Sequence, residues 1–345
     1  MNVSHICGWS RRCPATRTGG FSMVELMVAM TISLLLMAAR VTLLSNNSRA
    51  TTELDRSSRQ IENGRFAVDT LSRQIQMAGY YGELETAGAT YSTPDPCQPA
   101  FGSLGFATSP LTVPAPLQGY QGTALDPAPG CTAAPAPNTA ALVLRRLAGT
   151  STALGALSAG TAYLQTSRCA TDPTPTPFVL NATAASFTLL DFKCATPMPV
   201  RAFESTIYYV ASCSVCTGGS PDTIPTLKRV DCTTAGCTTV TALAEGIETL
   251  KIEYGFDTNG DGIPDVFLAT VDGIGGSKSN DWSNVTAVRL WVVSRTTEAS
   301  TSYTDTKTYS LGTTFGVVGP YNDGFKRRAY SVLVRLNNPA GWRES

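Results

Sequence analysis

The stretch Gly19-Gly20-Phe21-Ser22-Met23-Val24-Glu25, followed by the apolar run 26–44, decides the fold of this chain. Glu25 places a carboxylate at the head of a bilayer-length helix, which is costly unless that carboxylate has a partner. Cleavage after Gly20 would create an α-amino group on Phe21. Within one subunit this amine and Glu25 would be neighbours, and in an assembly Glu25 could neutralise the amine of the next subunit. The stretch therefore predicts processing, membrane insertion and subunit assembly.

Residues 1–20 are predicted to be a leader that is cleaved off. The leader carries three arginines and no acid, which predicts a cytoplasmic N-terminus by the positive-inside rule. Because about 20 helical residues cross a bilayer core, we expect a transmembrane segment over about 21–44, with Arg40 at the far interface. A simple membrane anchor is the alternative. Glu25 argues against it, because an anchor needs no acid near its start.

The helix is expected to continue past the membrane as far as residue 79. Between residues 21 and 78 there is no proline, and Gly64 is the only glycine. Gly79 is a suitable C-terminal stop. Apolar residues recur at helical spacing in the second half and predict an amphipathic stripe, made of Leu54, Ile61, Val68, Leu71 and Ile75.

Residues 93–137 hold 10 of the 21 prolines and are expected to form a long loop with little regular structure. A loop this long usually carries function or is tied down. Cys97 and Cys131 bracket the loop, so a disulfide between them is the simplest expectation. The alternative is a variable surface insertion.

The remaining chain predicts a mainly antiparallel β-sheet, so the fold class is α+β. We expect residues 80–345 to form a periplasmic or extracellular domain, whose sheet wraps against the exposed half of the long helix. The candidate strands alternate in polarity or are rich in β-branched and aromatic residues: 141–147, 186–190, 206–211, 226–231, 247–256, 266–271, 285–294, 303–311 and 328–336.

Composition argues against an enzyme and against nucleic-acid binding. Lysine plus arginine and aspartate plus glutamate number 26 each, so no general basic character attracts nucleic acid. The single histidine, His5, lies in the leader. The processed chain would therefore lack histidine-dependent nucleophiles and histidine-ligated metal sites, and no catalytic residue is expected.

Ten cysteines are present, two of them in the leader. An even number in an exported, membrane-anchored domain indicates disulfides. The alternative is a four-cysteine zinc site made of Cys213, Cys216, Cys232 and Cys237, which disulfide formation in an oxidising compartment would prevent. The disulfide candidates are Cys97, Cys131, Cys169, Cys194, Cys213, Cys216, Cys232 and Cys237.

The segment 257–265, Asp-Thr-Asn-Gly-Asp-Gly-Ile-Pro-Asp, has oxygen ligands at alternate positions and glycine at the sixth. This spacing suits a loop that wraps Ca²⁺. The twelfth position is Leu268, so the segment is not a full EF-hand. The alternative is a hairpin turn between two strands, since Asn-Gly and Asp-Gly favour turns. The expected Ca²⁺ ligands are the side chains of Asp257, Asn259, Asp261 and Asp265 and the carbonyl of Ile263.

Lys326-Arg327-Arg328 forms a small basic cluster. It could contact phosphate. Three charges at the start of a strand more often form a solvated edge or an interface, which is the expectation here.

The chain resembles minor pilins of type IV pili of the PilW type. The resemblance rests on Gly20-Phe21-Ser22-Met23-Val24-Glu25, which is similar to a class III prepilin signal, and on the helix end 75–80. Segments 247–254, 257–265, 285–294, 305–311, 320–323 and 325–336 agree as well. Thr42 departs from the pattern, because major pilins often carry a helix-kinking proline there, and this leaves the curvature of the helix open.

The resemblance implies a protein of Gram-negative bacteria that prepilin peptidase cleaves between Gly20 and Phe21 and methylates on Phe21. It implies residence in the inner membrane and then in a surface fimbrium. It also implies that Phe21 and Glu25 serve subunit assembly. The implied partners are other minor pilins, the major pilin, prepilin peptidase, the inner-membrane assembly platform and a tip adhesin.

The leading hypothesis is a minor pilin that takes part in initiating type IV pilus assembly and is incorporated in or near the tip. One alternative is a J-type pseudopilin of a type II secretion system, which shares the signal, helix and sheet. The long loop and the C-terminal segment 321–328 favour the pilus hypothesis. A second alternative is a binding or adhesion module at the tip.

Overall fold

The structure is a computed structural model that describes residues 20, 22–86, 88–172, 176–271 and 282–344. The chain divides into two compact units, Met1–Leu54 and Asp55–Ser345. One long helix, α1 (Met23–Met77), runs from the first unit into the second. The rest of the second unit is mainly antiparallel sheet. The predicted α+β class is confirmed.

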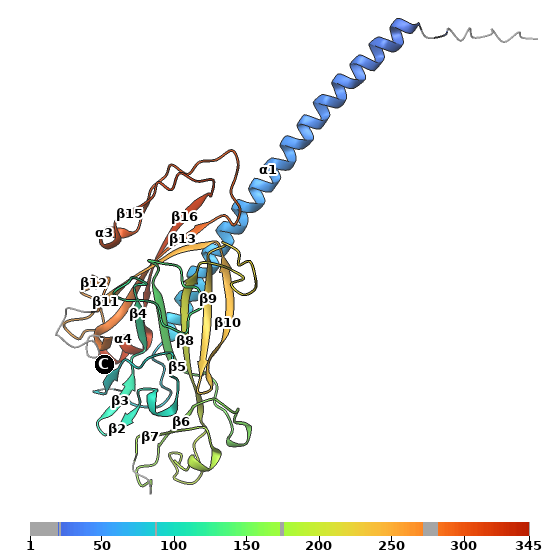
Figure 1. Cartoon of the computed structure of the whole chain (residues 1–345). Helices are drawn as coiled ribbons and strands as arrows, with labels where there is room; N and C mark the ends of the chain where they lie inside the picture. The colour runs from blue at the N-terminus through green and yellow to red at the C-terminus, as the bar shows by residue number, and fades with distance from the viewer. Residues whose placement is uncertain (1–19, 21, 87, 173–175, 272–281, 345) are drawn as a thin grey trace, which may run out of the picture. The chain divides into compact units, whose positions relative to one another are not determined.

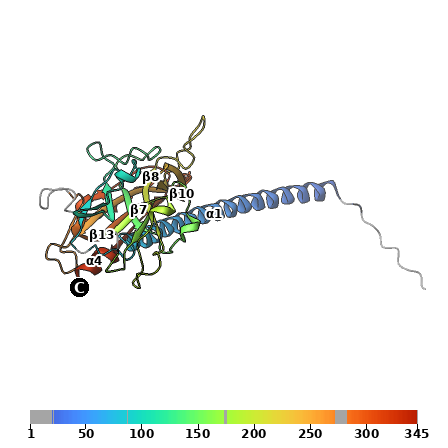
Figure 2. The same cartoon turned by 90° about the horizontal axis from the view of Figure 1, so that it is seen from below.

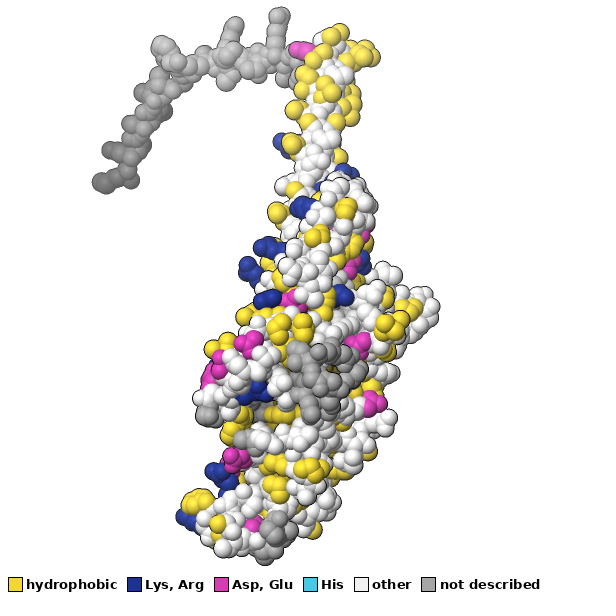
Figure 3. All heavy atoms as spheres, turned by 90° about the vertical axis from the view of Figure 1, so that its left-hand side faces the viewer, with side chains coloured by type: hydrophobic (Ala, Val, Ile, Leu, Met, Phe, Trp, Pro, Cys, Tyr) yellow, Lys and Arg dark blue, Asp and Glu magenta, His cyan; other side chains and the backbone are white. Residues whose placement is uncertain are grey.

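In the first unit, α1 presents an apolar surface. Side chains from Met23 to Ala50 are all exposed, and hydrophobic ones cover the N-terminal part of the helix, with basic ones further along (Figure 3). Among the described residues, α1 is the one helix long and apolar enough to cross a membrane. Thr42 does not interrupt it, because its hydroxyl donates to the carbonyls of Ala38 and Ala39, at 3.2 and 2.8 Å.

In the second unit, α1 packs through a stripe that shares Leu71 and Ile75 with the predicted one but is shifted in its earlier turns. The buried positions are Gln60, Gly64, Ala67, Leu71 and Ile75. Leu54 is 70% exposed, whereas Ile61 and Val68 are half-buried. The stripe is shifted because small residues let the sheet approach closely. A Cβ on Gly64 would lie 2.4 Å from a ring carbon of Tyr330.

The end of α1 is capped from the C-terminal part of the chain. Gly79 adopts a left-handed conformation (φ +74°) and its N–H donates to the carbonyl of Arg145 at 2.9 Å. The side-chain amide of Asn338 donates to the carbonyl of Ala78 at 3.0 Å. The Asn338 amide thus satisfies a carbonyl at the end of the helix, and the bond to Arg145 satisfies the N–H of Gly79.

A seven-stranded sheet has the order β10-β9-β8-β5-β4, with β6 pairing to β8 and β7 to β6. One face contributes Leu142, Leu144, Tyr208 and Val210 to the main core, together with the buried residues of α1. The other face forms a second cluster around Val143, Ile207 and Tyr209. The strands are β4 (Leu117–Tyr120), β5 (Ala141–Leu147), β6 (Tyr163–Thr166), β7 (Phe178–Asn181), β8 (Arg201–Ala211), β9 (Thr226–Thr233) and β10 (Gly236–Glu245).

A four-stranded antiparallel sheet has the order β12-β11-β13-β16. Alternate residues of β11 and β13, such as Leu250, Ile252, Val288 and Leu290, point into the same core, as the two-residue period of strands requires. The strands are β11 (Ile247–Phe256), β12 (Val266–Leu268), β13 (Val285–Arg295) and β16 (Arg327–Arg335). Helix α4 (Asn337–Arg343) follows β16 and lies near the C-terminus in both cartoon views (Figures 1 and 2).

Short elements complete the domain. β1 (Thr90–Ser92), β2 (Ala107–Thr108) and β3 (Leu111–Pro114) form a small sheet, and β14 (Tyr309–Ser310) pairs with β15 (Val317–Val318). β2, β3, β6 and β7 gather at one end of the domain in Figure 1, and Figure 2 views the domain from that end. The remaining short helices are η1 (Phe101–Ser103), η2 (Leu154–Ala156), η3 (Ala184–Ser186), η4 (Trp282–Asn284) and α3 (Gly312–Phe315).

The proline-rich segment 93–137 contains more regular structure than expected, since β2, β3, β4 and η1 fall within it. It is tied down by the disulfide Cys97–Cys131 and by the buried Arg145, which donates to the carbonyls of Pro94 and Ala115 at 2.8 and 3.2 Å. Burial lowers the pKa of this guanidinium to about 10. Ala128 and Cys131 pack on the outer face of the seven-stranded sheet, so the segment covers that face.

Several predicted strands are wrong or too long. Segment 186–190 forms no strand. Its first residue, Ser186, is the last residue of η3, and Leu190 forms only an isolated bridge. Of 303–311, only Tyr309–Ser310 is strand. β10 was not predicted. Its run Thr238-Thr239-Val240-Thr241 is mostly exposed and its register with β9 is shifted twice, so it lacks a clean apolar alternation.

Candidate functional site

The first turn of α1 is organised by Ser22 and Glu25. The backbone N–H of Ser22 donates to the Glu25 carboxylate at 3.1 Å, and the N–H of Val24 donates to the Ser22 hydroxyl at 3.4 Å. A serine at the helix cap and a glutamate three residues later form a capping box. From the sequence, Glu25 was expected only as a partner for an amine. The geometry adds that the same carboxylate also caps the helix.

The expected processing site lies directly before this turn. Gly20 is exposed, and a Cβ placed on it would meet nothing within 4 Å. Phe21 lies outside the described residues, so the structure gives no geometry for the predicted contact between its amine and Glu25. The capping bonds hold the carboxylate at the N-terminal end of α1, where the helix dipole stabilises negative charge.

The eight cysteines outside the leader form four disulfides. Cys97 pairs with Cys131, Cys169 with Cys194, Cys213 with Cys216, and Cys232 with Cys237. The expectation of disulfides is confirmed.

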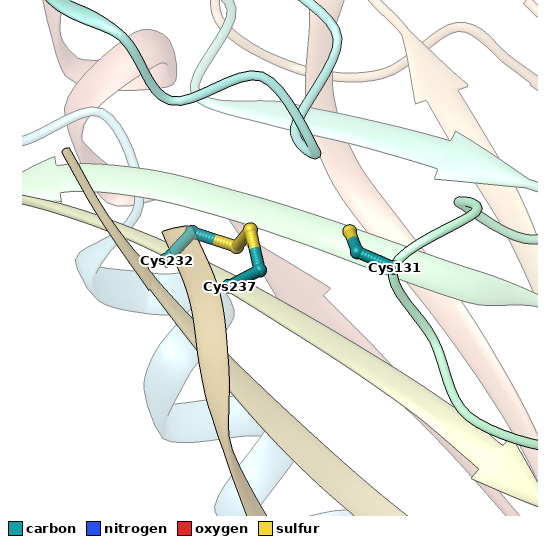
Figure 4. Close-up of side chains that lie close together, drawn as sticks. All are labelled: Cys131, Cys232 and Cys237. Atoms are coloured by element: carbon teal, nitrogen blue, oxygen red, sulfur yellow. A yellow bond between two sulfur atoms is a disulfide. The ribbon is translucent and has the colours of Figure 1, made fainter. Parts of the chain in front are cut away.

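The alternative of a zinc site is not supported by this arrangement. Cys213 and Cys216 pair with each other, as do Cys232 and Cys237, so none of the four is a thiolate. Within the described residues, the one group of His, Cys, Asp or Glu side chains close enough to share an ion is Cys131, Cys232 and Cys237. Figure 4 shows Cys131 facing the Cys232–Cys237 bond. Disulfide sulfur does not replace a thiolate as a ligand, so these cysteines are structural.

The acidic loop 257–265 joins β11 to β12 as a hairpin, with Phe256 opposite Val266. Asp257 is 1% exposed and accepts the N–H groups of Gly260 and Gly262 at 2.6 and 2.9 Å. It also forms an ion pair with Arg343 at 3.0 Å. Burial opposes ionisation of Asp257, but the bonds from Gly262, Arg343 and Gly260 outweigh it and hold the pKa below its usual range.

The other expected Ca²⁺ ligands are more exposed. Asp265 accepts the N–H and hydroxyl of Thr258 at 2.8 and 2.7 Å, and these bonds lower its pKa. Asp261 accepts the N–H of Ile263 at 2.8 Å, and Asn259 donates to Asp261 at 3.1 Å. The structure therefore collects the ligands in one loop, while their oxygens bond mainly to the loop's own N–H groups.

Within the basic cluster 326–328, Arg328 is exposed on the end strand β16 as expected, whereas Arg327 is the centre of a buried ion network. Its guanidinium side chain is 1% exposed. It binds both oxygens of Glu248 at 2.6 and 3.0 Å and both oxygens of Asp323 at 2.6 and 2.8 Å. A fifth bond, at 3.1 Å, reaches Asp305, which is fully buried.

This network joins β11, β16, the segment between β13 and β14 that carries Asp305, and the segment between β15 and β16 that carries Asp323. Burial opposes the charge of Arg327, but Asp323 and Glu248 outweigh it and raise the pKa. The sequence does not indicate this network, because Glu248 and Asp305 are distant from Arg327 in the chain. The spacing of Asp323 and Arg327, four residues apart, was a local signal that could have indicated the pair.

Comparison with protein families agrees with both ends of the chain. Residues 16–39 match the prokaryotic N-terminal methylation motif, and residues 207–338 match the type IV pilus-assembly protein W family. The first match contains the capping box of α1. The second contains the end of β8, all of β9 and β10, the four-stranded sheet, the acidic loop and the Arg327 network. Together the two matches support a pilin of the PilW type.

The solved structure of a type IV-like pilin from Thermus thermophilus is also similar, with 12% identity, coverage of 81% of this chain and 98% of that chain, and a TM-score of 0.34. No curated protein matches the chain. The methylation motif and the apolar helix place the pilin in the inner membrane before it assembles into a surface pilus. Proteins of this family are structural, and pilins assemble with other pilins in a pilus.

Proposed function

We propose that this minor pilin takes part in initiating type IV pilus assembly and is incorporated in or near the pilus tip. The observation that carries the proposal is the presence, on one chain, of the methylation motif at 16–39 and the pilus-assembly protein W match at 207–338. The proposed partners are other minor pilins, the major pilin, prepilin peptidase, the inner-membrane assembly platform and a tip adhesin.

The first unit supports an assembly role physically. Its helix exposes apolar side chains on all sides, which suits first a lipid environment and then the packed helices of a fibre. Glu25, held at the helix start, is the group that would neutralise the Phe21 amine of a neighbouring subunit. The pairing between subunits is directional, so a subunit can add below another and extend a helical filament.

The second unit supports a place at the end of the filament. A subunit inside a filament must accept neighbours both above and below it, whereas the last subunit needs neighbours on one side only. The domain carries two excursions, β1–β3 and β6–β7, at one end (Figure 1). Such additions are compatible with the terminal position, where no further subunit packs.

A clean deletion tests the proposal. If the pilin initiates assembly, the deletion strain should lack surface pili, and blocking retraction should restore only a small number. Re-expression of the wild-type chain should restore the normal number. Full piliation of the deletion strain would contradict the proposal. A defect in type II secretion with normal pili would instead assign the chain to the pseudopilins.

We further propose that the loop 257–265 binds Ca²⁺ in a structural role, through Asp257, Asn259, Asp261, Asp265 and the carbonyl of Ile263. The support is the concentration of these oxygens in one hairpin loop. Millimolar Ca²⁺ should raise the melting temperature of the full chain relative to a chelator, and Asp261→Ala should remove this effect. Equal melting of both proteins in both conditions would show that the loop is only a turn.

A further inference from the structure

The loop between β8 and β9 carries a Cys-x-x-Cys disulfide that none of the functions assigned above uses. Cys213 and Cys216 are bonded to each other across Ser214 and Val215. Cysteine pairs at this spacing occur in disulfide oxidoreductases, where the reactive cysteine is partly exposed and its thiolate lies beside a cation or a helix N-terminus. Outside residues 1–20 the chain has no histidine, so a cation beside this pair must be a lysine or an arginine.

The two sulfurs differ in their access to solvent. Cys213 is 4% exposed, whereas Cys216 is half-buried and follows Val215, which is 61% exposed. Asp222 holds this turn in place, since its carboxylate accepts the N–H groups of Ser214 and Val215 at 2.8 and 2.7 Å. These bonds do not involve sulfur, so they remain when the S–S bond opens. An incoming thiolate can therefore reach Cys216 more readily than Cys213.

Lys228 places an ammonium against the accessible sulfur. It lies on β9, is 5% exposed, and its Nζ donates to the Cys216 sulfur at 3.1 Å. Burial lowers the pKa of Lys228, and the charge of Asp222 only partly offsets this. A buried ammonium is stabilised by a negative charge beside it, and the neutral disulfide supplies none. Reduction of the bond would supply one, because Cys216 would become a thiolate at hydrogen-bond distance from Lys228.

Lys228 therefore favours the reduced form of the pair. A disulfide whose reduced form is stabilised is a strong oxidant of other thiols. A stabilised thiolate also leaves faster during exchange, which favours release of Cys216 from a mixed disulfide. The contact thus predicts a disulfide that accepts electrons readily, rather than one that only holds the loop together.

The Cys232–Cys237 disulfide provides a comparison within the same molecule. Its cysteines are also close in sequence, five residues apart, and pack on the same face of the seven-stranded sheet as Cys216. The Cys216 sulfur lies 3.1 Å from the carbonyl oxygen of Cys213. The Cys237 sulfur has a similar contact, at 3.2 Å from the carbonyl oxygen of Pro96. In the described part of the chain, a hydrogen bond from a cationic side chain reaches Cys216 but neither sulfur of this second disulfide.

We propose that the Cys213–Cys216 disulfide is an exchange site that oxidises a dithiol of another polypeptide. One thiolate of the dithiol attacks the Cys216 sulfur, so that a mixed disulfide forms and Cys213 leaves and is protonated. The second thiolate then attacks the partner's own sulfur in the mixed disulfide, and Cys216 leaves as a thiolate beside Lys228. Two electrons pass from the dithiol to the pilin. Of the two thiol protons, one ends on Cys213 and the other is released to solvent.

The partner is a polypeptide because the turn is exposed and offers its sulfur at the surface, where a thiol carried by another chain can approach. This activity would be additional to the role of the pilin in assembly. It does not depend on whether the pilin sits at the tip.

The first test is a redox titration of the full chain in detergent with mixtures of reduced and oxidised dithiothreitol. After acid quenching and alkylation, peptide mass spectrometry follows the four disulfides separately. Cys213–Cys216 should be half-reduced at a ratio of reduced to oxidised dithiothreitol at least about tenfold lower than Cys232–Cys237, which corresponds to about 30 mV. This comparison is made within the wild-type protein and so does not depend on folding of a mutant.

A lysine variant tests the role of the ammonium. Lys228→Met should raise the ratio that half-reduces Cys213–Cys216 by about tenfold and leave that of Cys232–Cys237 unchanged. Lys251→Met is the matched control, since Lys251 is also a strand lysine whose pKa is lowered by burial. Its ammonium lies over the Phe315 ring, at 5.5 Å, and not against a sulfur. This control should change neither ratio.

Serine variants identify the sulfur that exchanges. Dithiodipyridine, an uncharged disulfide, should react with Cys216 in Cys213→Ser at least about tenfold faster than with Cys213 in Cys216→Ser. Oxidised wild-type pilin should also convert a reduced two-cysteine peptide to its disulfide. Pilin that carries both serine substitutions keeps the other three disulfides and should not oxidise the peptide.

The proposal fails if wild-type Cys213–Cys216 needs the same ratio of dithiothreitol as Cys232–Cys237 or a higher one, or if Lys228→Met leaves its ratio unchanged. Equal oxidation of the peptide by wild-type pilin and by the pilin with both serines would also overturn it. Equal reactivity of the two single cysteines would overturn the assignment of Cys216 as the sulfur that is attacked.

Discussion

Arg327→Leu should strongly destabilise the folded domain. The substitution removes five charge-assisted hydrogen bonds to Glu248, Asp305 and Asp323. Leucine fills part of the space but leaves three carboxylates without their shared cation. Breaking a buried ion pair from one side typically costs about 3–5 kcal/mol, because the remaining charge stays buried.

The three carboxylates contribute unequally to this cost. The side chain of Asp323 is 35% exposed and that of Glu248 is 20% exposed, so water can partly replace Arg327 at both. Asp305 is 0% exposed, and its remaining bonds come from the hydroxyls of Tyr303 and Tyr309 and the N–H of Lys307. We therefore expect a loss of about 3 kcal/mol, the lower part of the range, arising mainly at Asp305.

Urea unfolding of the full chain in detergent, followed by circular dichroism, measures this loss. Arg328→Leu is the matched control, because Arg328 is exposed and adjacent in sequence; it should change stability by less than about 0.5 kcal/mol. In a double-mutant cycle, the protein with both Arg327→Leu and Asp305→Asn should lose less unfolding free energy than the sum of the losses of the two single mutants. A loss below about 1 kcal/mol for Arg327→Leu, or strict additivity, would refute the account of the network.

Three further predictions concern processing, assembly and pH. Mass spectrometry of the mature protein should find an N-methylated Phe21 as the first residue; a chain that retains 1–20 would contradict the processing site. Glu25→Ala should still insert into the membrane but should lose crosslinks to neighbouring pilins. Glu62→Ala, at an exposed position further along α1, is the control and should keep its crosslinks. Normal crosslinking of Glu25→Ala would contradict the assembly role. The bonds from Arg327 hold the pKa of Asp323 below its usual range, so its contribution to stability is present above the unfolded pKa of about 3.9 and is lost as pH falls through the folded value. Asp323→Asn should therefore flatten the fall in unfolding free energy below about pH 5, and an unchanged slope would refute this.

The elements set by local sequence could be predicted, and those set by distant partners could not. The apolar run and the glycine at 79 predicted α1 to within a few residues. The stripe that packs on the sheet was predicted correctly at Leu71 and Ile75. Its earlier turns were misplaced, because hydrophobicity favours large side chains while close packing uses Gly64 and Ala67. A sequence shows which residues are apolar but not how near a neighbour such as Tyr330 will come.

The ionic residues show the same limit. The motif Gly20 to Glu25 could be recognised because its partners are adjacent in sequence. The cluster around Arg327 was expected to form a solvated edge or an interface. Its burial gave no signal, because two of the three carboxylates that bind Arg327, those of Glu248 and Asp305, reach it only through folding.

The most direct test of the central claim is the position of this pilin in sheared fibres. An epitope tag inserted in the exposed turn 217–221, between β8 and β9, can be labelled with gold and viewed by electron microscopy. A minor pilin that initiates assembly should appear as a single label at one end of each fibre. Label along the whole fibre, or fibres without any label from cells that express the tagged protein, would contradict the account.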